Sequence, residues 1–140
     1  MARASSAMVA LACALVLHGA LAAGTEKRPP LKGISSVRAA NYGAPSKVVH
    51  AREEVNLIVA ELNELRAKPW RRGETKLHCY ASVFLFEGEK RVAVFRMRPT
   101  ERVVEVAQEK AQPGYTIDVE PGALPNLTKL LEEAPPPRCK

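Results

Sequence analysis

The sequence predicts an α+β fold in which one amphipathic helix packs on a four-stranded antiparallel meander, flanked by a flexible N-terminal arm and a flexible C-terminal tail. Residues 46–68 repeat apolar side chains at helical spacing. Residues 76–119 alternate apolar and polar side chains between turn signals, as antiparallel strands do. Residues 23–45 carry Pro, Gly and Ser without an apolar period, and residues 121–140 form a Pro-rich end. We therefore expect one domain, over residues 46–120.

Residues 1–22 have the pattern of a secretory signal peptide. Arg3 precedes an apolar run, and the small-residue site Ala20-Leu21-Ala22 follows it. The apolar run ends at Ala23 and is shorter than the roughly 20 residues that span a bilayer. No second such run follows in the sequence. We therefore expect a secreted, extracellular protein with no transmembrane segment.

The helix is expected from Ser46 to Lys68. Ser46 follows Pro45 and is a suitable N-cap, and Pro69 ends the pattern. The apolar residues in between are spaced by three and four positions, so they form one stripe along the helix: Val48, Ala51, Val55, Ile58, Leu62 and Leu65. Because predicted strands follow at once, we expect this stripe to cover a sheet, with membrane insertion or docking to a partner as the alternative.

The register of the four predicted strands follows from three turn signals. Gly88-Glu89 suits a two-residue hairpin that pairs Phe86 with Arg91. Tight turns at Pro99-Thr100 and Pro113-Gly114 then align the next two strands. In this register the face under the helix carries Tyr80, Phe84, Phe86, Phe95, Met97, Val104, Val106, Ile117 and Val119. The opposite face is half apolar, and we expect the C-terminal tail or a protein partner to cover it.

The predicted export decides which modifications we expect at the cysteines and at one Asn-x-Ser/Thr sequon. Cys13 would leave with the signal peptide, so an oxidising compartment favours a disulfide between Cys79 and Cys139. A mixed or intermolecular disulfide through the tail cysteine is the alternative. Asn126-Leu127-Thr128 is the one Asn-x-Ser/Thr sequon, so we expect a glycan on Asn126.

No pattern of residues in the chain predicts catalysis, a cofactor or a metal site. His78 and Cys79 are adjacent, but neighbouring strand residues point to opposite faces, and a disulfide would consume the thiol. The sequence contains no Gly-rich phosphate loop, no Gly-x-Ser-x-Gly elbow and no His-Glu-x-x-His helix. We therefore expect a protein that is not an enzyme.

The chain is basic, with a formal net charge of +6, and its charge is dense around Trp70. Arg66, Lys68, Arg71 and Arg72 surround this tryptophan, so sulfate or phosphate groups could bind here while Trp70 contacts a sugar or a lipid headgroup. The alternative is a solvated linker whose tryptophan caps the core. The predicted export argues against a nucleic-acid partner.

A secreted helix followed by an antiparallel sheet resembles the cystatin-like superfamily of cystatins, latexin-like proteins and cathelin domains. The best local match is Lys76-Leu77-His78-Cys79-Tyr80-Ala81-Ser82-Val83, which is similar to the cysteine-bearing late strand of secreted cystatins. The resemblance implies a helix wrapped by a sheet and a relation to protease inhibitors or host-defence factors. The chain lacks the Gln-x-Val-x-Gly hairpin with which cystatins block papain-like proteases, so no inhibitory residue carries over.

These observations lead to two expectations about function. The first is a secreted, non-enzymatic binding protein with a cystatin-like domain, a divergent protease-inhibitor relative or host-defence factor whose partner is an extracellular protein such as a protease. The second is a basic protein that binds the extracellular matrix, glycosaminoglycans or an anionic membrane surface through its charge.

Overall fold

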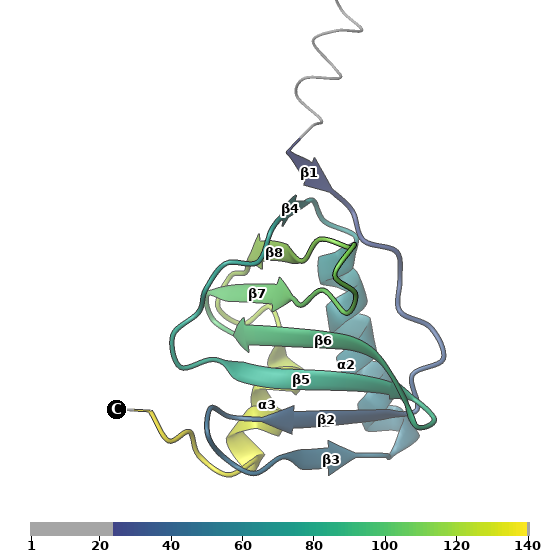
Figure 1. Ribbon diagram of the computed structural model, residues 1–140. Helices are drawn as coiled ribbons and strands as arrows, with labels where there is room; N and C mark the ends of the chain where they lie inside the picture. Colours follow the sequence, from purple (N-terminus) through teal and green to yellow (C-terminus); the bar gives the residue numbers. More distant parts are fainter. Residues whose placement is uncertain (1–23, 140) are drawn as a thin grey trace, which may run out of the picture.

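The computed structural model describes residues 24–139, which form one antiparallel sheet of eight strands and two helices (Figure 1). The predicted signal peptide, residues 1–22, lies outside the described residues. The strands are β1 (Thr25–Glu26), β2 (Ser36–Ala40), β3 (Lys47–Val49), β4 (Trp70–Arg72), β5 (Ala81–Glu87), β6 (Lys90–Arg98), β7 (Arg102–Glu105) and β8 (Tyr115–Asp118). The helices are α2 (Arg52–Arg66) and α3 (Pro125–Glu133). The order of the strands across the sheet is β1-β4-β8-β7-β6-β5-β2-β3.

Both helices cover the same face of the sheet, and neither covers the opposite face (Figure 1). The core lies between these two layers because each element turns its apolar side chains inward. Helix α2 buries Val55, Ile58, Leu62 and Leu65, and α3 buries Leu127, Leu130 and Leu131. The sheet contributes Val37, Ala39, Ala81, Val83, Leu85, Ala93, Phe95, Met97, Val103 and Ile117. Each fully buried aliphatic or aromatic side chain contributes roughly 1.5–3 kcal/mol to folding.

The expected fold of one helix on a four-stranded, cystatin-like meander is therefore wrong. Strands β5–β8 are neighbours in the sheet, but β2 and β3 extend it beyond β5, while β4 and β1 extend it beyond β8. The expected flexible arm contributes β1 and β2, and the expected flexible tail contains α3. Without these strands, β5 and β8 would each present an unpaired edge, which folded proteins avoid.

Helix α2 begins at Arg52 rather than at the expected Ser46. Residues Lys47–Val49 form β3 instead, because they pair with β2 across a tight turn in which the Ala44 N–H donates to the Asn41 carbonyl at 3.0 Å. Two consecutive valines favour a strand over the first turn of a helix. The helix ends at Arg66, close to the expected end before Pro69.

A β-bulge in β6 shifts the expected register of the central hairpin. The turn itself forms as expected: Gly88 has a φ of +62°, and Phe86 pairs with Arg91. The next pair, however, is Leu85 with Ala93, so Val92 is an extra residue in β6. Every pair beyond the bulge differs by one residue from the expected register.

This one-residue shift exchanges the two faces of β5. Ala81, Val83 and Leu85 are buried under the helices, whereas Tyr80, Phe84 and Phe86 lie on the open face and are half-buried. Val104, also expected under the helix, pairs with Arg96 and lies on the open face, while Phe95, Met97, Ile117 and Val119 lie in the core as expected. The two later connections are also longer than the expected tight turns, since they span residues 99–101 and 106–114.

A disulfide joins Cys79 to Cys139, as predicted, with a Cα–Cα distance of 5.8 Å. It fixes the end of the chain beside the start of β5. The Arg138 N–H donates to the Tyr42 carbonyl at 2.8 Å in the same place. The C-terminal segment is therefore held against the β2–β3 turn.

Candidate functional site

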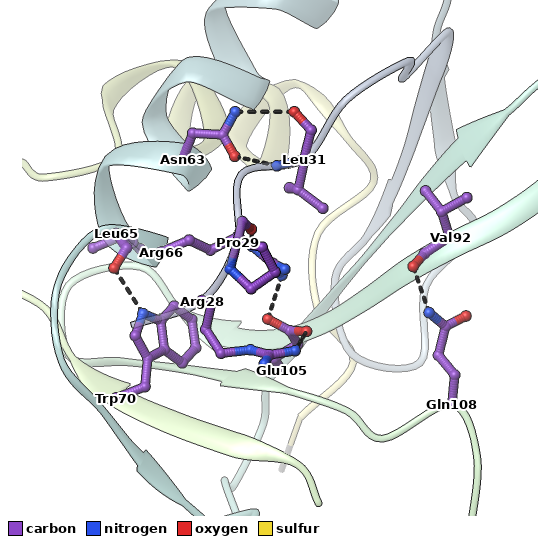
Figure 2. Close-up of polar contacts among 10 residues, drawn as sticks. All are labelled: Arg28, Pro29, Leu31, Asn63, Leu65, Arg66, Trp70, Val92, Glu105 and Gln108. Atoms are coloured by element: carbon purple, nitrogen blue, oxygen red, sulfur yellow. Dashed lines mark hydrogen bonds and ion pairs between the residues drawn. The ribbon is translucent and has the colours of Figure 1, made fainter. Parts of the chain in front are cut away.

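The four cations predicted to bind an anion do not share one surface. Arg66 is buried, with 6% of its surface exposed, and its Nε donates to the Pro29 carbonyl at 2.6 Å. Figure 2 shows Glu105 between the guanidinium groups of Arg66 and Arg28, and Arg28 donates to this carboxylate at 3.1 Å. Burial lowers the pKa of Arg66, while the charge of Glu105 opposes this effect. Arg66 thus fastens the N-terminal segment to the sheet.

Trp70 caps the core, as one of the two interpretations of this segment expected. It is 0% exposed, and its Nε1 donates to the Leu65 carbonyl at 2.7 Å (Figure 2). A buried ring with a satisfied N–H cannot also hold a sugar or a lipid headgroup. Trp70 is therefore part of the packing between α2 and the sheet.

Arg71 and Arg72 are adjacent in β4 and form ion pairs with different partners. Arg71 pairs with Asp118 at 3.3 Å, and Arg72 pairs with Glu26 at 2.9 Å. Hydrogen bonds from Tyr115 and then Arg72 lower the pKa of Glu26. Since neighbouring residues of a strand point to opposite faces, the two arginines cannot grip one ligand together. The remaining predicted cation, Lys68, is exposed just after α2.

The predicted glycan site, Asn126, lies in the first turn of α3. Its Nδ2 donates to Glu61 Oε1 at 2.7 Å, and the same carboxylate accepts the Leu127 N–H at 3.0 Å and the Asn126 N–H. Glu61 of α2 thus caps the N-terminus of α3, where partial positive charge gathers. The amide nitrogen that a glycan would occupy is therefore in use within the folded protein.

The open face of the sheet carries aromatic and arginine side chains in an interleaved pattern. Phe84 and Phe86 stand on β5, with Arg38 on β2 beside them and Arg91 on β6. Further along β6, Arg96 lies on the same face as Tyr80. We call these six residues, Arg38, Tyr80, Phe84, Phe86, Arg91 and Arg96, the arginine–aromatic face. All three arginines are exposed, and all three rings are half-buried.

Each arginine of this face lies over a ring. The distance from the guanidinium carbon to the ring centroid is 5.4 Å for Arg38 over Phe86, and it is 5.8 Å for Arg91 over Phe84. Both contacts are diagonal, because Arg38 is directly opposite Phe84 and Arg91 is directly opposite Phe86. These four side chains line a hollow of about 570 Å³. Each contact contributes on the order of 0.5–1 kcal/mol at an exposed site.

The third contact, between Arg96 and Tyr80, lies toward β7, where further arginines follow. The guanidinium carbon of Arg96 lies 5.2 Å from the Tyr80 centroid. Beyond Arg96, Arg98 of β6 is directly opposite Arg102 of β7. Arg98 pairs with Glu101 at 3.2 Å, and Arg102 pairs with Asp118 at 2.7 Å. Hydrogen bonds from Arg102 and then Arg71 lower the pKa of Asp118.

Among the described residues, the arginine–aromatic face itself has no acidic partner. Within residues 24–139, no carboxylate lies within the 4.0 Å ion-pair distance of Arg38, Arg91 or Arg96. Uncompensated positive charge on a flat, exposed sheet attracts anions. The sequence did contain a signal for the rings, since Tyr80, Phe84 and Phe86 recur at even spacing, but the register expected without the bulge at Val92 placed them under the helix.

A hollow of about 440 Å³ lies between α3, the C-terminal segment and the β6–β7 turn, but Asn41 Nδ2 in its wall already donates to the Leu131 and Pro135 carbonyls. Among the described residues, no three His, Cys, Asp or Glu side chains are placed to hold a metal ion. None of the helices in the described part of the chain is long and apolar enough to cross a membrane.

Comparison with protein-family models, with curated proteins and with solved structures gave no match for this chain.

Proposed function

We propose that this protein is a secreted, non-enzymatic binding protein that holds an anionic polymer on its arginine–aromatic face. The observation that carries the proposal is the group of exposed guanidiniums, Arg38, Arg91 and Arg96, that stand over rings without an acidic partner among the described residues. A guanidinium donates two parallel hydrogen bonds to an oxyanion, and stacking reduces the freedom that it loses on binding. These groups are thus prepared for anionic ligands.

A polymer suits this face better than a small anion. Each exposed contact with one charge is weak, because water and salt screen it. The arginines are spread over β2 and β6 rather than gathered around one point. Only a ligand that carries many charges can engage them together, and the linked contacts then add up.

The test is binding to immobilised heparin, to single-stranded DNA and to anionic vesicles. The face variant combines Arg38→Ala, Arg91→Ala and Arg96→Ala, which leave the core untouched because all three side chains are exposed. We expect the wild-type protein to bind at least one probe with a salt-dependent affinity. Each lost contact reduces the slope of log K against log salt by roughly 1, so the face variant should lose about 3.

The matched control removes the same charge elsewhere. Arg52→Ala, Lys68→Ala and Lys129→Ala change exposed cations of α2, the following loop and α3. We expect the control variant to retain most of the affinity. Equal losses in both variants would mean that net charge alone attracts the probes, and an absence of binding to all three probes would overturn the proposal.

A further inference from the structure

We infer that the anionic polymer is a sulfated polysaccharide, which binds along β6 with its sulfate groups on the guanidiniums. The inference rests on the proposed function and names the ligand of the same face. Three observations favour it: the length of the cationic track, the identity of its cations, and the state of its rings.

The cationic track consists of Arg38, Arg91 and Arg96, the arginines that have no acidic partner among the described residues, and it is extended rather than gathered at one point. Arg91 and Arg96 are five residues apart on β6, with the bulge at Val92 between them, so a rise of about 3.3 Å per residue spaces them by roughly 15 Å. Arg38 flanks them from β2, whereas Arg98 and Arg102 continue the row toward β7 but already pair with Glu101 and Asp118. An extended chain with repeated anionic groups fits such a track, whereas a compact ligand would reach only part of it.

Every cation of the track is an arginine. Lysine offers a strongly hydrated point charge, while the planar guanidinium matches two oxygens of a tetrahedral oxyanion at once. The hydroxyl-bearing residues Ser36 and Ser82 lie on the same face, opposite Phe86 and Arg96. A ligand that combines sulfate esters with sugar hydroxyls meets both kinds of group.

The rings are not free to bind bases or lipid. Single-stranded nucleic acid binds when bases stack on exposed aromatic faces, but here guanidiniums lie over Tyr80, Phe84 and Phe86. Insertion into a bilayer needs apolar side chains that protrude, and all three rings are half-buried between their neighbours. The face therefore presents guanidinium edges rather than rings to its ligand.

The test compares dissociation constants for size-defined heparin oligosaccharides, desulfated heparin, single-stranded oligo-dT and phosphatidylserine vesicles, measured by isothermal titration at one salt concentration. We expect heparin to bind at least about tenfold more tightly than each of the other probes. We also expect the affinity to rise with the length of the heparin oligosaccharide until it spans the track. For longer oligosaccharides, the affinity per binding site should stay constant.

A charge-preserving variant separates arginine chemistry from charge. Arg38→Lys, Arg91→Lys and Arg96→Lys keep the net charge but lose the planar fork, so we expect heparin binding to weaken about fivefold to tenfold. The control Arg52→Lys makes the same exchange at an exposed arginine of α2, away from the face, and should bind as the wild type does.

The outcomes distinguish this inference from the proposed function. If oligo-dT, vesicles or desulfated heparin bind as tightly as heparin and the face variant loses them all, the polyanion function stands and the sulfated ligand is wrong. Equal heparin binding by the lysine variant would also contradict the inference. If the face variant binds every probe as the wild type does, both proposals fail.

Discussion

Glu61 joins the two helices, and its replacement by alanine should destabilise the whole fold. The carboxylate is 8% exposed and accepts hydrogen bonds from the Leu127 N–H, the Asn126 N–H and Asn126 Nδ2. Glu61→Ala removes all of these acceptors at once. The first turn of α3 then has backbone donors that only water can satisfy.

The expected loss is about 2–4 kcal/mol in the free energy of unfolding. A helix cap contributes about 0.5–2 kcal/mol, and hydrogen bonds to a charged group contribute about 1.5–3 kcal/mol each. Relief from the desolvation of a buried carboxylate offsets part of this sum. Glu61→Gln keeps one acceptor oxygen but loses the charge, so about half of the loss is expected.

The assay is urea unfolding followed by far-ultraviolet circular dichroism and by the fluorescence of Trp70, which is buried in the core. Glu64→Ala is the control, because Glu64 is exposed on the same helix and its removal should change stability by less than about 0.5 kcal/mol. If Glu61→Ala and Glu64→Ala unfold at the same urea concentration, the capping argument is refuted.

Three further predictions concern covalent and ionic links. Replacing Cys79 and Cys139 by serine opens a loop of 60 residues and should cost about 4 kcal/mol by the loop-entropy relation, which guanidinium unfolding of the two forms would measure; a loss below about 1 kcal/mol would contradict it. Glu105→Ala leaves the buried guanidinium of Arg66 without its anion and should cost about 3 kcal/mol in the same assay, whereas Glu105→Gln should cost less. The pKa of Asp118 lies below its ordinary value, so the contribution of its carboxylate to stability is present above about pH 4 and is lost as the pH falls through the lower folded value. Between pH 6 and pH 2, the urea midpoint of Asp118→Asn should therefore fall less steeply than that of the wild type. Parallel curves for the two proteins would show that the contacts of Asp118 with Arg71 and Arg102 contribute nothing.

The sequence predicted those features that depend on local chemistry. The turn at Gly88 needs a positive φ, which glycine adopts freely, and the pair next to it is correct. The end of α2 before Pro69 and the pairing of Cys79 with Cys139 also follow from short-range rules or from simple counting.

Short-range rules could not predict which face of a strand packs against the helices when both faces are apolar. Strand β5 is apolar on both sides, so hydrophobicity alone did not decide whether Val83 or Phe84 faces the helices. The extra residue Val92 decided it, and no turn signal marks a bulge in the middle of a strand. The same error hid the candidate site, because its rings were assigned to the core.

Similar limits apply to the ends of the domain. Residues 36–40 are too short for a strong strand pattern, and they become a strand because β5 offers an edge to pair with. Helix α3 covers only nine residues, and its first turn depends on a carboxylate from α2. Both elements are stabilised by contacts that lie far away in the sequence.

The arginines that lie over Phe84 and Phe86 also affect the tendency of the protein to self-associate. Two neighbouring phenylalanines on an open sheet would ordinarily invite self-association between copies, which is the first step of aggregation. Guanidiniums over the rings shield this apolar surface and add mutual repulsion between approaching molecules, as gatekeeper residues do. The guanidiniums of the proposed polyanion site thus also oppose self-association through the half-buried rings.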